Sequence, residues 1–170
     1  MRVIKDREIY QEVVEKGLLQ ATRFLWIATA NIKDMQVKQL GRYHSILGSF
    51  AAMSGKGLEI RLIHAGKVSA AFQESFRRFP ELARMMETLI CPRVHFKMVI
   101  VDGVWAYTGS ANFTGAGMGI KSENRRNFEI GTLIDDPLGV KELMDYFDRI
   151  WMGQHCLRCG HRKICPQPIE

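Results

Sequence analysis

The sequence predicts an α/β fold, because short β-prone runs alternate along the chain with segments of helical periodicity. The chain has 170 residues, 46% of them apolar, which is the size and composition of one globular domain. No internal repeat or low-complexity tract interrupts the alternation.

The N-terminal half is expected to contain three helices and two strands. The helical spans are residues 6–19, 35–53 and 68–79, and the strands are residues 23–30 and 58–64. The middle helix is expected to be interrupted near Gly41 and Gly48. Phe72, Phe76 and Phe79 recur on one stripe of the third helix, which indicates core packing and not contact with a cofactor.

The C-terminal half begins with an expected β-hairpin. Residues 94–101 read as a strand inside a sheet, Asp102-Gly103 is a two-residue turn signal, and residues 104–108 supply a second β-prone run. A tight turn would place Lys97 opposite Thr108 and His95 opposite Ser110. A strand over residues 127–134 and a helix over residues 137–151 are expected to follow.

The expected hairpin carries the most informative pattern in the chain. The pattern is His95-x-Lys97-x4-Asp102, followed after six residues by Gly109-Ser110-x-Asn112. A neutral imidazole can attack phosphorus and form a phosphohistidine. Lys97, Ser110 and Asn112 can hold phosphoryl oxygens by charge and hydrogen bonds. The residue types therefore predict a phosphodiester-cleaving site that needs no metal.

This spacing resembles the HKD signature of the phospholipase D superfamily at every signature position, and the sequence carries it once. The resemblance implies a phospholipase D-like fold, with a mixed β-sheet flanked by helices. It also implies that Glu129, in the segment Asn127-Phe-Glu129, hydrogen-bonds the imidazole of His95 and fixes its tautomer. Asp102, at the predicted turn, is expected to have a structural role and not to transfer a proton.

Among members of the superfamily, the chain is most similar to small single-motif nucleases, which place two copies of the motif across a dimer axis. The resemblance implies a homodimer in which one His95 attacks the phosphodiester and His95 of the partner subunit protonates the leaving oxygen. Two alternatives stay open. One is a phospholipid phosphodiesterase or phosphatidyltransferase, and the other is a non-catalytic nucleic-acid-binding dimer, which the complete signature disfavours.

Charge and hydropathy add weaker expectations. The chain has 24 Lys and Arg against 18 Asp and Glu, and a net charge of +6 favours a polyanionic partner such as nucleic acid. Residues 115–127 resemble a flexible loop that would line the substrate groove. The longest uncharged apolar stretch, residues 24–30, is far shorter than the ~20 residues of a membrane span. With no apolar signal core at the start, we expect a cytoplasmic protein without a transmembrane segment.

Residues 153–170 are expected to form a cysteine-rich tail after a catalytic domain of residues 1–152. Cys156, Cys159 and Cys165 have the spacing Cys-x2-Cys-x5-Cys, which is typical of a metal site.

Three thiolates need a fourth ligand to complete a tetrahedral site. We favour Cys91, the one other cysteine, because it would pin the tail beside the catalytic strand; His161 and His155 are the local competitors. A structural zinc ion is favoured, and an iron–sulfur cluster would use the same four thiolates. The other interpretations are a disulfide and free thiols. The expected task of a metal here is folding and not catalysis.

Overall fold

The computed structural model describes residues 1–39 and 41–170, in which seven strands form one mixed sheet. β2, β5 and β6 run parallel to one another, and every other neighbouring pair is antiparallel. In order across the sheet the strands are β1 (Arg2–Lys5), β9 (Ile130–Ile134), β8 (Trp105–Gly109), β7 (Lys97–Val101), β2 (Phe24–Thr29), β5 (Glu59–His64) and β6 (Met86–Ile90). The predicted α/β class is confirmed.

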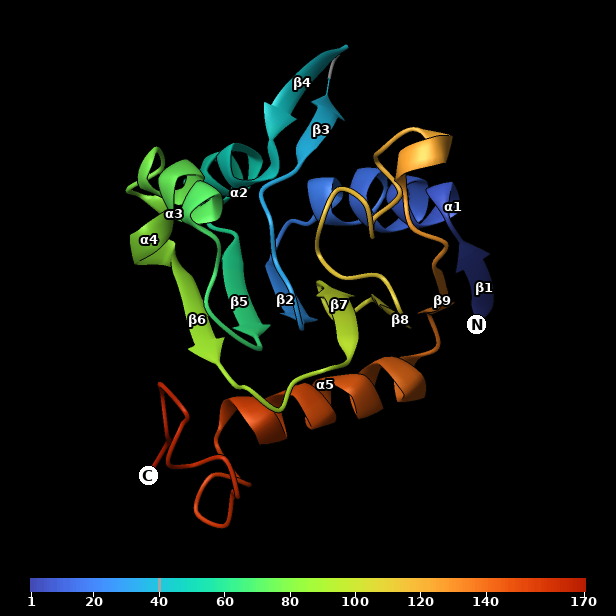
Figure 1. Cartoon of the computed structure of the whole chain (residues 1–170). Coiled ribbons are helices and arrows are strands. Elements are labelled where there is room, and N and C mark those ends of the chain that lie inside the picture. Colours follow the sequence, from blue (N-terminus) through green and yellow to red (C-terminus); the bar gives the residue numbers. More distant parts are fainter. Residues whose placement is uncertain (40) are drawn as a thin grey trace.

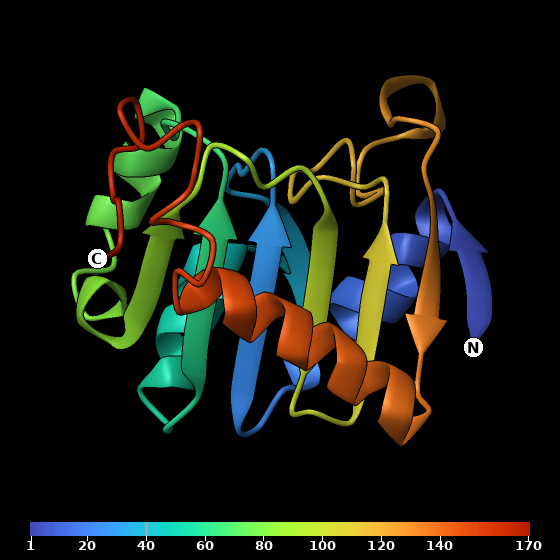
Figure 2. The same cartoon turned by 90° about the horizontal axis from the view of Figure 1, so that it is seen from below.

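Helices cover both faces of the sheet, as Figure 1 shows. Against one face pack α1 (Arg7–Ile9), the π-helical turn η1 (Tyr10–Glu15), the 3₁₀ turn η2 (Leu18–Gln20), α2 (Ile46–Ser54), α3 (Ala70–Arg77) and α4 (Leu82–Met85). The long helix α5 (Pro137–Trp151) crosses the other face (Figure 2). Each face of the sheet therefore has its own apolar core.

Helix α5 matches its predicted span. Asp136 caps its first turn by accepting the Gly139 N–H at 2.7 Å, and Pro137 occupies the first helical position. Its buried side reaches the sheet through Phe147, whose ring stacks on that of Trp26 at 5.0 Å between centroids. No helix within residues 1–39 and 41–170 combines the length and apolarity needed to cross a bilayer.

The prediction of a helix over residues 35–53 is wrong for the part before residue 46. Its first part forms a two-stranded hairpin of β3 (Gln36–Gln39) and β4 (Arg42–Ser45), and α2 begins only at Ile46. Gly41 has a φ of 78°, which suits a turn and not a helix. Gly48 lies inside α2 without interrupting it. Leu40, also within the predicted span, lies outside the described residues.

The two edge strands, β1 and β6, are not predicted from the sequence. They are four and five residues long, and each has a single buried residue, Ile4 or Met86. The helix predicted over residues 6–19 is present as three successive turns, α1, η1 and η2.

The hairpin of β7 and β8 is present, but the predicted register is wrong by one residue. Lys97 lies opposite Gly109, and Met98 lies opposite Thr108. Three residues separate the paired strands, because Asp102 (φ 55°) and Gly103 (φ 69°) make the turn and Val104 is an extra residue after it. The shift places Thr108 on the face of the sheet opposite to the predicted one.

Asp102 ties this hairpin to the start of β2. Its carboxylate accepts the backbone N–H groups of Thr22 at 3.0 Å, Arg23 at 2.8 Å and Phe24 at 2.9 Å. Burial raises the pKa of the Asp102 carboxyl, but these hydrogen bonds outweigh burial and hold that pKa below its usual value. Asp102 therefore fixes the end of β7 that lies far from His95.

We predict that Asp102→Asn lowers the free energy of unfolding at neutral pH by about 1–2 kcal/mol, because charge-assisted hydrogen bonds are lost while Asn still tolerates the positive φ. The folded-state pKa is depressed, so the stabilisation is complete above the unfolded-state pKa and disappears as pH falls through the folded-state value. Urea unfolding at a series of pH values measures this.

Asp135→Asn is the matched control. Among the described residues its exposed carboxylate pairs with the N-terminal ammonium alone, at 3.3 Å, so its loss should change stability by less than about 0.5 kcal/mol. A deficit in Asp102→Asn that persists in acid would contradict the assignment.

Candidate active site

Polar side chains gather at the edge of the sheet where β7 begins. Because β7 is antiparallel to both of its neighbours, its first residue, Lys97, lies beside the last residues of β2 and β8. Gly109, at the end of β8, pairs in turn with Gly131 near the start of β9. Four signature residues flank these strand ends, namely His95, Lys97, Ser110 and Asn112, together with Glu129.

His95 and Lys97 differ sharply in exposure. His95 is exposed and lies just before β7, whereas Lys97 is only 7% exposed. The Lys97 ammonium donates a hydrogen bond to the carbonyl oxygen of His95 at 2.6 Å. A buried positive charge therefore lies beside the backbone of an accessible imidazole, and this pairing suits an anionic substrate.

Asn112 is oriented by residues at the end of β2. Its Oδ1 accepts the backbone N–H of Asn31 at 3.1 Å and the hydroxyl of Thr29 at 3.4 Å. Thr29 is buried, and its hydroxyl also accepts the N–H of Phe113 at 3.0 Å. Because the protein occupies the amide oxygen, the NH₂ group is the side of Asn112 that can donate to a phosphate.

Ser110 and Glu129 contact each other directly. The Ser110 hydroxyl donates to the Glu129 carboxylate and accepts the N–H of Ile130 at 3.1 Å. The other carboxylate oxygen accepts the side chain of Asn127 at 3.0 Å. Within the described chain the Glu129 carboxylate thus bonds Ser110 and Asn127, and the hydrogen bond to His95 that the resemblance implies is not among its contacts.

Asp6 is a supporting residue that the sequence does not predict. Its carboxylate accepts the Glu129 N–H at 3.0 Å, and its own N–H donates to the Glu129 carbonyl at 2.9 Å. Asp6 has a φ of 48°, an uncommon conformation for a residue other than glycine. This pairing joins positions 123 residues apart, so no local pattern could have revealed it.

Close packing explains why position 109, the first of Gly-Ser-x-Asn, is a glycine. A Cβ on Gly109 would lie 2.6 Å from the Cα of Gly131 and 2.5 Å from the Tyr107 hydroxyl. A Cβ on Gly131 would lie 2.3 Å from the Tyr107 ring. Tyr107 is fully buried, and burial raises its pKa to about 12. The two glycines therefore make room for this ring next to Ser110.

The loop over residues 115–127, predicted to be flexible, makes defined backbone contacts. Asn127 donates its backbone N–H to the carbonyl of Ala116 at 3.1 Å, and a 3₁₀ turn, η3 (Glu123–Arg125), lies between them. Gly119, with a φ of 73°, lies against the backbone of Asp6. These contacts close the loop on itself and hold it beside Glu129.

Exposed apolar side chains flank the site. Phe128 is 95% exposed, Ile130 is 58% exposed, and Val3 on the neighbouring strand β1 is 59% exposed. We call these three residues the apolar rim. Figure 2 shows β1 lying beyond the end of α5. Clustered exposed apolar side chains are typical of an interaction surface.

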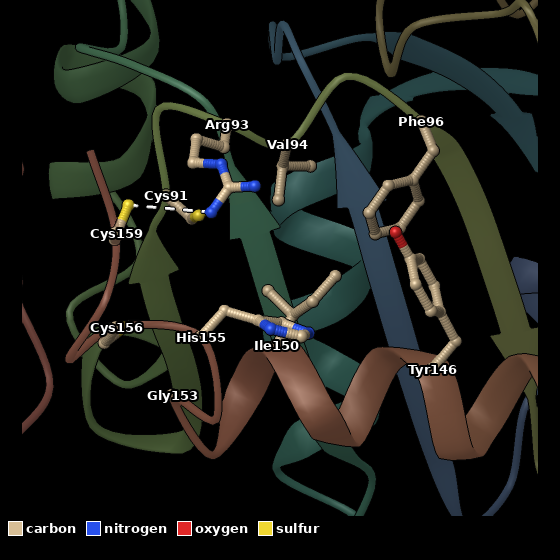
Figure 3. A pocket seen from close by; sticks show the side chains of 10 residues that line it. All are labelled: Cys91, Arg93, Val94, Phe96, Tyr146, Ile150, Gly153, His155, Cys156 and Cys159. Atoms are coloured by element: carbon tan, nitrogen blue, oxygen red, sulfur yellow. Dashed lines mark hydrogen bonds between the residues drawn. The ribbon is translucent and has the colours of Figure 1, made fainter. Parts of the chain in front are cut away.

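A pocket of about 180 Å³ lies between α5, the tail (residues 153–170) and the loop of residues 91–96, which we call the His95 loop (Figure 3). Val94 and Phe96, the neighbours of His95, line it together with Tyr146 from α5, whereas neither Glu129 nor any of the five polar signature residues does. Cys91, Cys156 and Cys159 also line it. The candidate site is therefore the open sheet edge and not this pocket.

The thiol of Cys159 has defined partners. Arg93 donates to Cys159 Sγ at 3.7 Å (Figure 3). A hydrogen bond from the backbone of His161, together with Arg93, lowers the pKa of this thiol. Within residues 1–39 and 41–170, no three His, Cys, Asp or Glu side chains are arranged to hold a metal ion, so the structure does not show the predicted zinc or iron–sulfur site.

The mixed sheet and the polar cluster at its edge define a phosphodiesterase-type α/β domain. The family model described as "Cardiolipin synthase, PLD-like domain" matches residues 14–151. The chain therefore belongs to the phospholipase D superfamily, through this PLD-like domain. No curated protein sequence matches the chain.

Solved structures share the fold. NucT from Helicobacter pylori matches with a TM-score of 0.63 and 12% identity over 88% of this chain and 94% of NucT. Nuc from Salmonella typhimurium, a phospholipase D family member, matches with a TM-score of 0.62 and 17% identity over 88% of this chain and 92% of Nuc. TrmBL2, an archaeal chromatin protein, matches with a TM-score of 0.56 and 13% identity over 89% of this chain and 52% of TrmBL2. The predicted phospholipase D-like fold is confirmed.

We predict that Gly109→Ala lowers the free energy of unfolding by about 2–3 kcal/mol, because the added methyl group overlaps the Tyr107 hydroxyl and the Gly131 backbone. Thermal unfolding should shift down by roughly 5–10 °C. Gly115→Ala is the control, since a Cβ there meets open space. Equal melting temperatures for the two variants would show that the glycine contact is unimportant.

Proposed function

We propose that the protein is a metal-independent phosphodiesterase, most specifically a nuclease that works through a phosphohistidine in an active site shared by two subunits. The observation that carries the proposal is the exposed imidazole of His95 beside the buried ammonium of Lys97. Asn112 lies at the same sheet edge with an NH₂ group that can donate to phosphate oxygens, while Ser110 donates its hydroxyl to Glu129.

The reaction proceeds in two displacements. In the first, a ring nitrogen of His95 attacks phosphorus, a P–N bond forms, and the P–O bond to the leaving group breaks as His95 of the partner subunit gives that oxygen a proton. In the second, the partner's His95 takes a proton from water, whose oxygen attacks phosphorus and breaks the P–N bond. Each displacement leaves the two imidazoles ready for the next.

Lys97 and Asn112 stabilise charge during these steps. The Lys97 ammonium is already desolvated, so its attraction for the developing negative charge is stronger than that of an exposed lysine. The Asn112 amide donates from a fixed orientation, because Thr29 and Asn31 hold its oxygen. Glu129 acts as a positioning residue, through the hydroxyl of Ser110.

The apolar rim supports the shared-site proposal. Val3 and Ile130 of the rim lie beside Ser110, and a two-fold pairing of this surface would bury the rim while bringing two copies of the signature together. A single imidazole cannot be both the nucleophile and the acid in one displacement, so a second copy supplies the missing group.

Nucleic acid is the substrate class favoured here. The chain carries a net charge of +6, which suits a polyphosphate. Among the proteins of similar fold, TrmBL2 is described with a mode of DNA binding. Cleavage of a phosphodiester needs no base contact, so the signature itself favours neither DNA nor RNA.

A phospholipid phosphodiesterase or phosphatidyltransferase is the second candidate. The observation that favours it is the matching family model, which is named for cardiolipin synthase. Assays of single-stranded DNA, duplex DNA, RNA and phospholipid vesicles, side by side, separate the two. Cleavage of the vesicles alone would replace the nuclease proposal.

We predict nucleic-acid cleavage that persists in EDTA, because the imidazole replaces a metal-bound water as nucleophile. His95→Asn and Lys97→Met should each lower turnover by at least about 10³-fold. His44→Asn, at an exposed histidine on β4, should retain full activity. Turnover that is lost in EDTA and restored only by Mg²⁺, in protein that stays folded by circular dichroism, would exclude this mechanism.

We predict a homodimer of twice 19.5 kDa by light scattering. Phe128→Asp should shift the protein toward monomer and lower its activity in parallel, because it places a charge in the apolar rim. Leu138→Asp, at an 82% exposed residue of α5, should leave both properties unchanged. Full activity in a stable monomer would refute the shared site.

A further inference from the structure

All four cysteines of the chain come together beside the His95 loop. Cys91 follows β6, whereas Cys156, Cys159 and Cys165 belong to the tail, residues 153–170, at least 65 positions later. All four line one cavity of about 20 Å³ under the tail. The chain has no other cysteine, so the fold has gathered its complete set of thiols around one small space.

The size of this cavity suits one ion. About 10–15 Å³ of volume accessible to a water-sized sphere holds one water molecule, so a cavity of about 20 Å³ has room for a single zinc ion.

The charge around the cavity suits the same ion. Zinc with four thiolates carries a net charge of −2. Arg93 and Arg162 both line the cavity and supply two positive charges. His161 also lines it, whereas His155 lines only the larger pocket of Figure 3.

Few apolar contacts order the tail. Residues 153–170 contain turns and no helix or strand. Of their three large aliphatic side chains, Leu157 and Ile164 are each 74% exposed, and Ile169 is half-buried. The tail reaches the sheet through polar contacts, with the Gln167 side chain accepting the Ile90 N–H at 2.5 Å. A segment that buries so little apolar surface needs another source of order, and metal ligation supplies one.

We propose that Cys91, Cys156, Cys159 and Cys165 bind one zinc ion, which fastens the tail to the loop that carries His95. The thiols surround the cavity but do not yet stand at ligand spacing, so binding turns their side chains inward. Cys91 is the critical ligand, because it lies four residues before His95 and its N–H already donates to the carbonyl of His64 at 2.9 Å. The metal thus anchors one end of the His95 loop.

Elemental analysis of untagged protein tests this directly, with about one zinc per chain expected. Cys156→Ser and Cys91→Ser should each lose the zinc and lower the melting temperature by at least about 5 °C. In Cys91→Ser, hydrogen exchange should also rise over residues 91–96 and 153–170. His155→Ala is the matched control and should keep the zinc, because His155 does not line the cavity.

Zinc-free protein with four titratable thiols, a disulfide among these cysteines, or iron with sulfide would each overturn the proposal. Zinc retained in Cys91→Ser would overturn the four-cysteine set. Zinc binding is independent of the proposed function, since His95→Asn should be inactive and still hold one zinc. An inactive wild-type protein that holds one zinc would support this proposal and refute only the nuclease assignment.

Discussion

The candidate site depends on one feature of the sheet, which is the insertion of β7 antiparallel between β2 and β8. This arrangement brings the start of β7 to the edge where β2 and β8 end, so the two halves of the signature meet. Asp102 holds β7 to β2 at the opposite edge through three backbone N–H groups. Because a slip of one residue would turn Lys97 to the other face, this clamp also protects the geometry of the site.

The sequence predicted the parts of the fold that local signals determine. Helix α5 has a capping residue, a proline at its first position and a continuous apolar stripe, and the signature has five polar residues in fixed spacing. The register of the hairpin was not predictable in this way, because Val104 enters as an extra residue. The contact of Glu129 with Ser110 and its support by Asp6 likewise depend on chain segments that are distant in sequence.

The similar structures share the fold at 12–17% identity, so the chemistry must be argued from the residues of this chain. The residues of the candidate site form an exposed layer and a buried layer. His95 is exposed to a substrate, while Lys97, Thr29 and Tyr107 are buried behind the site edge and hold its backbone and side chains in place. On the other side of the His95 loop, at Cys91, lies the cavity that all four cysteines line.

The central claim is that His95 becomes covalently attached to phosphorus. The most direct test is to mix the protein with a cleavable oligonucleotide, quench in alkali, where a phosphohistidine bond survives, and locate the adduct by peptide mass spectrometry. The account predicts a nucleotidyl group on His95, present in wild-type protein and absent from His95→Asn. An adduct on another residue, or cleavage with no adduct at any time point while His95→Asn remains active, would contradict the account.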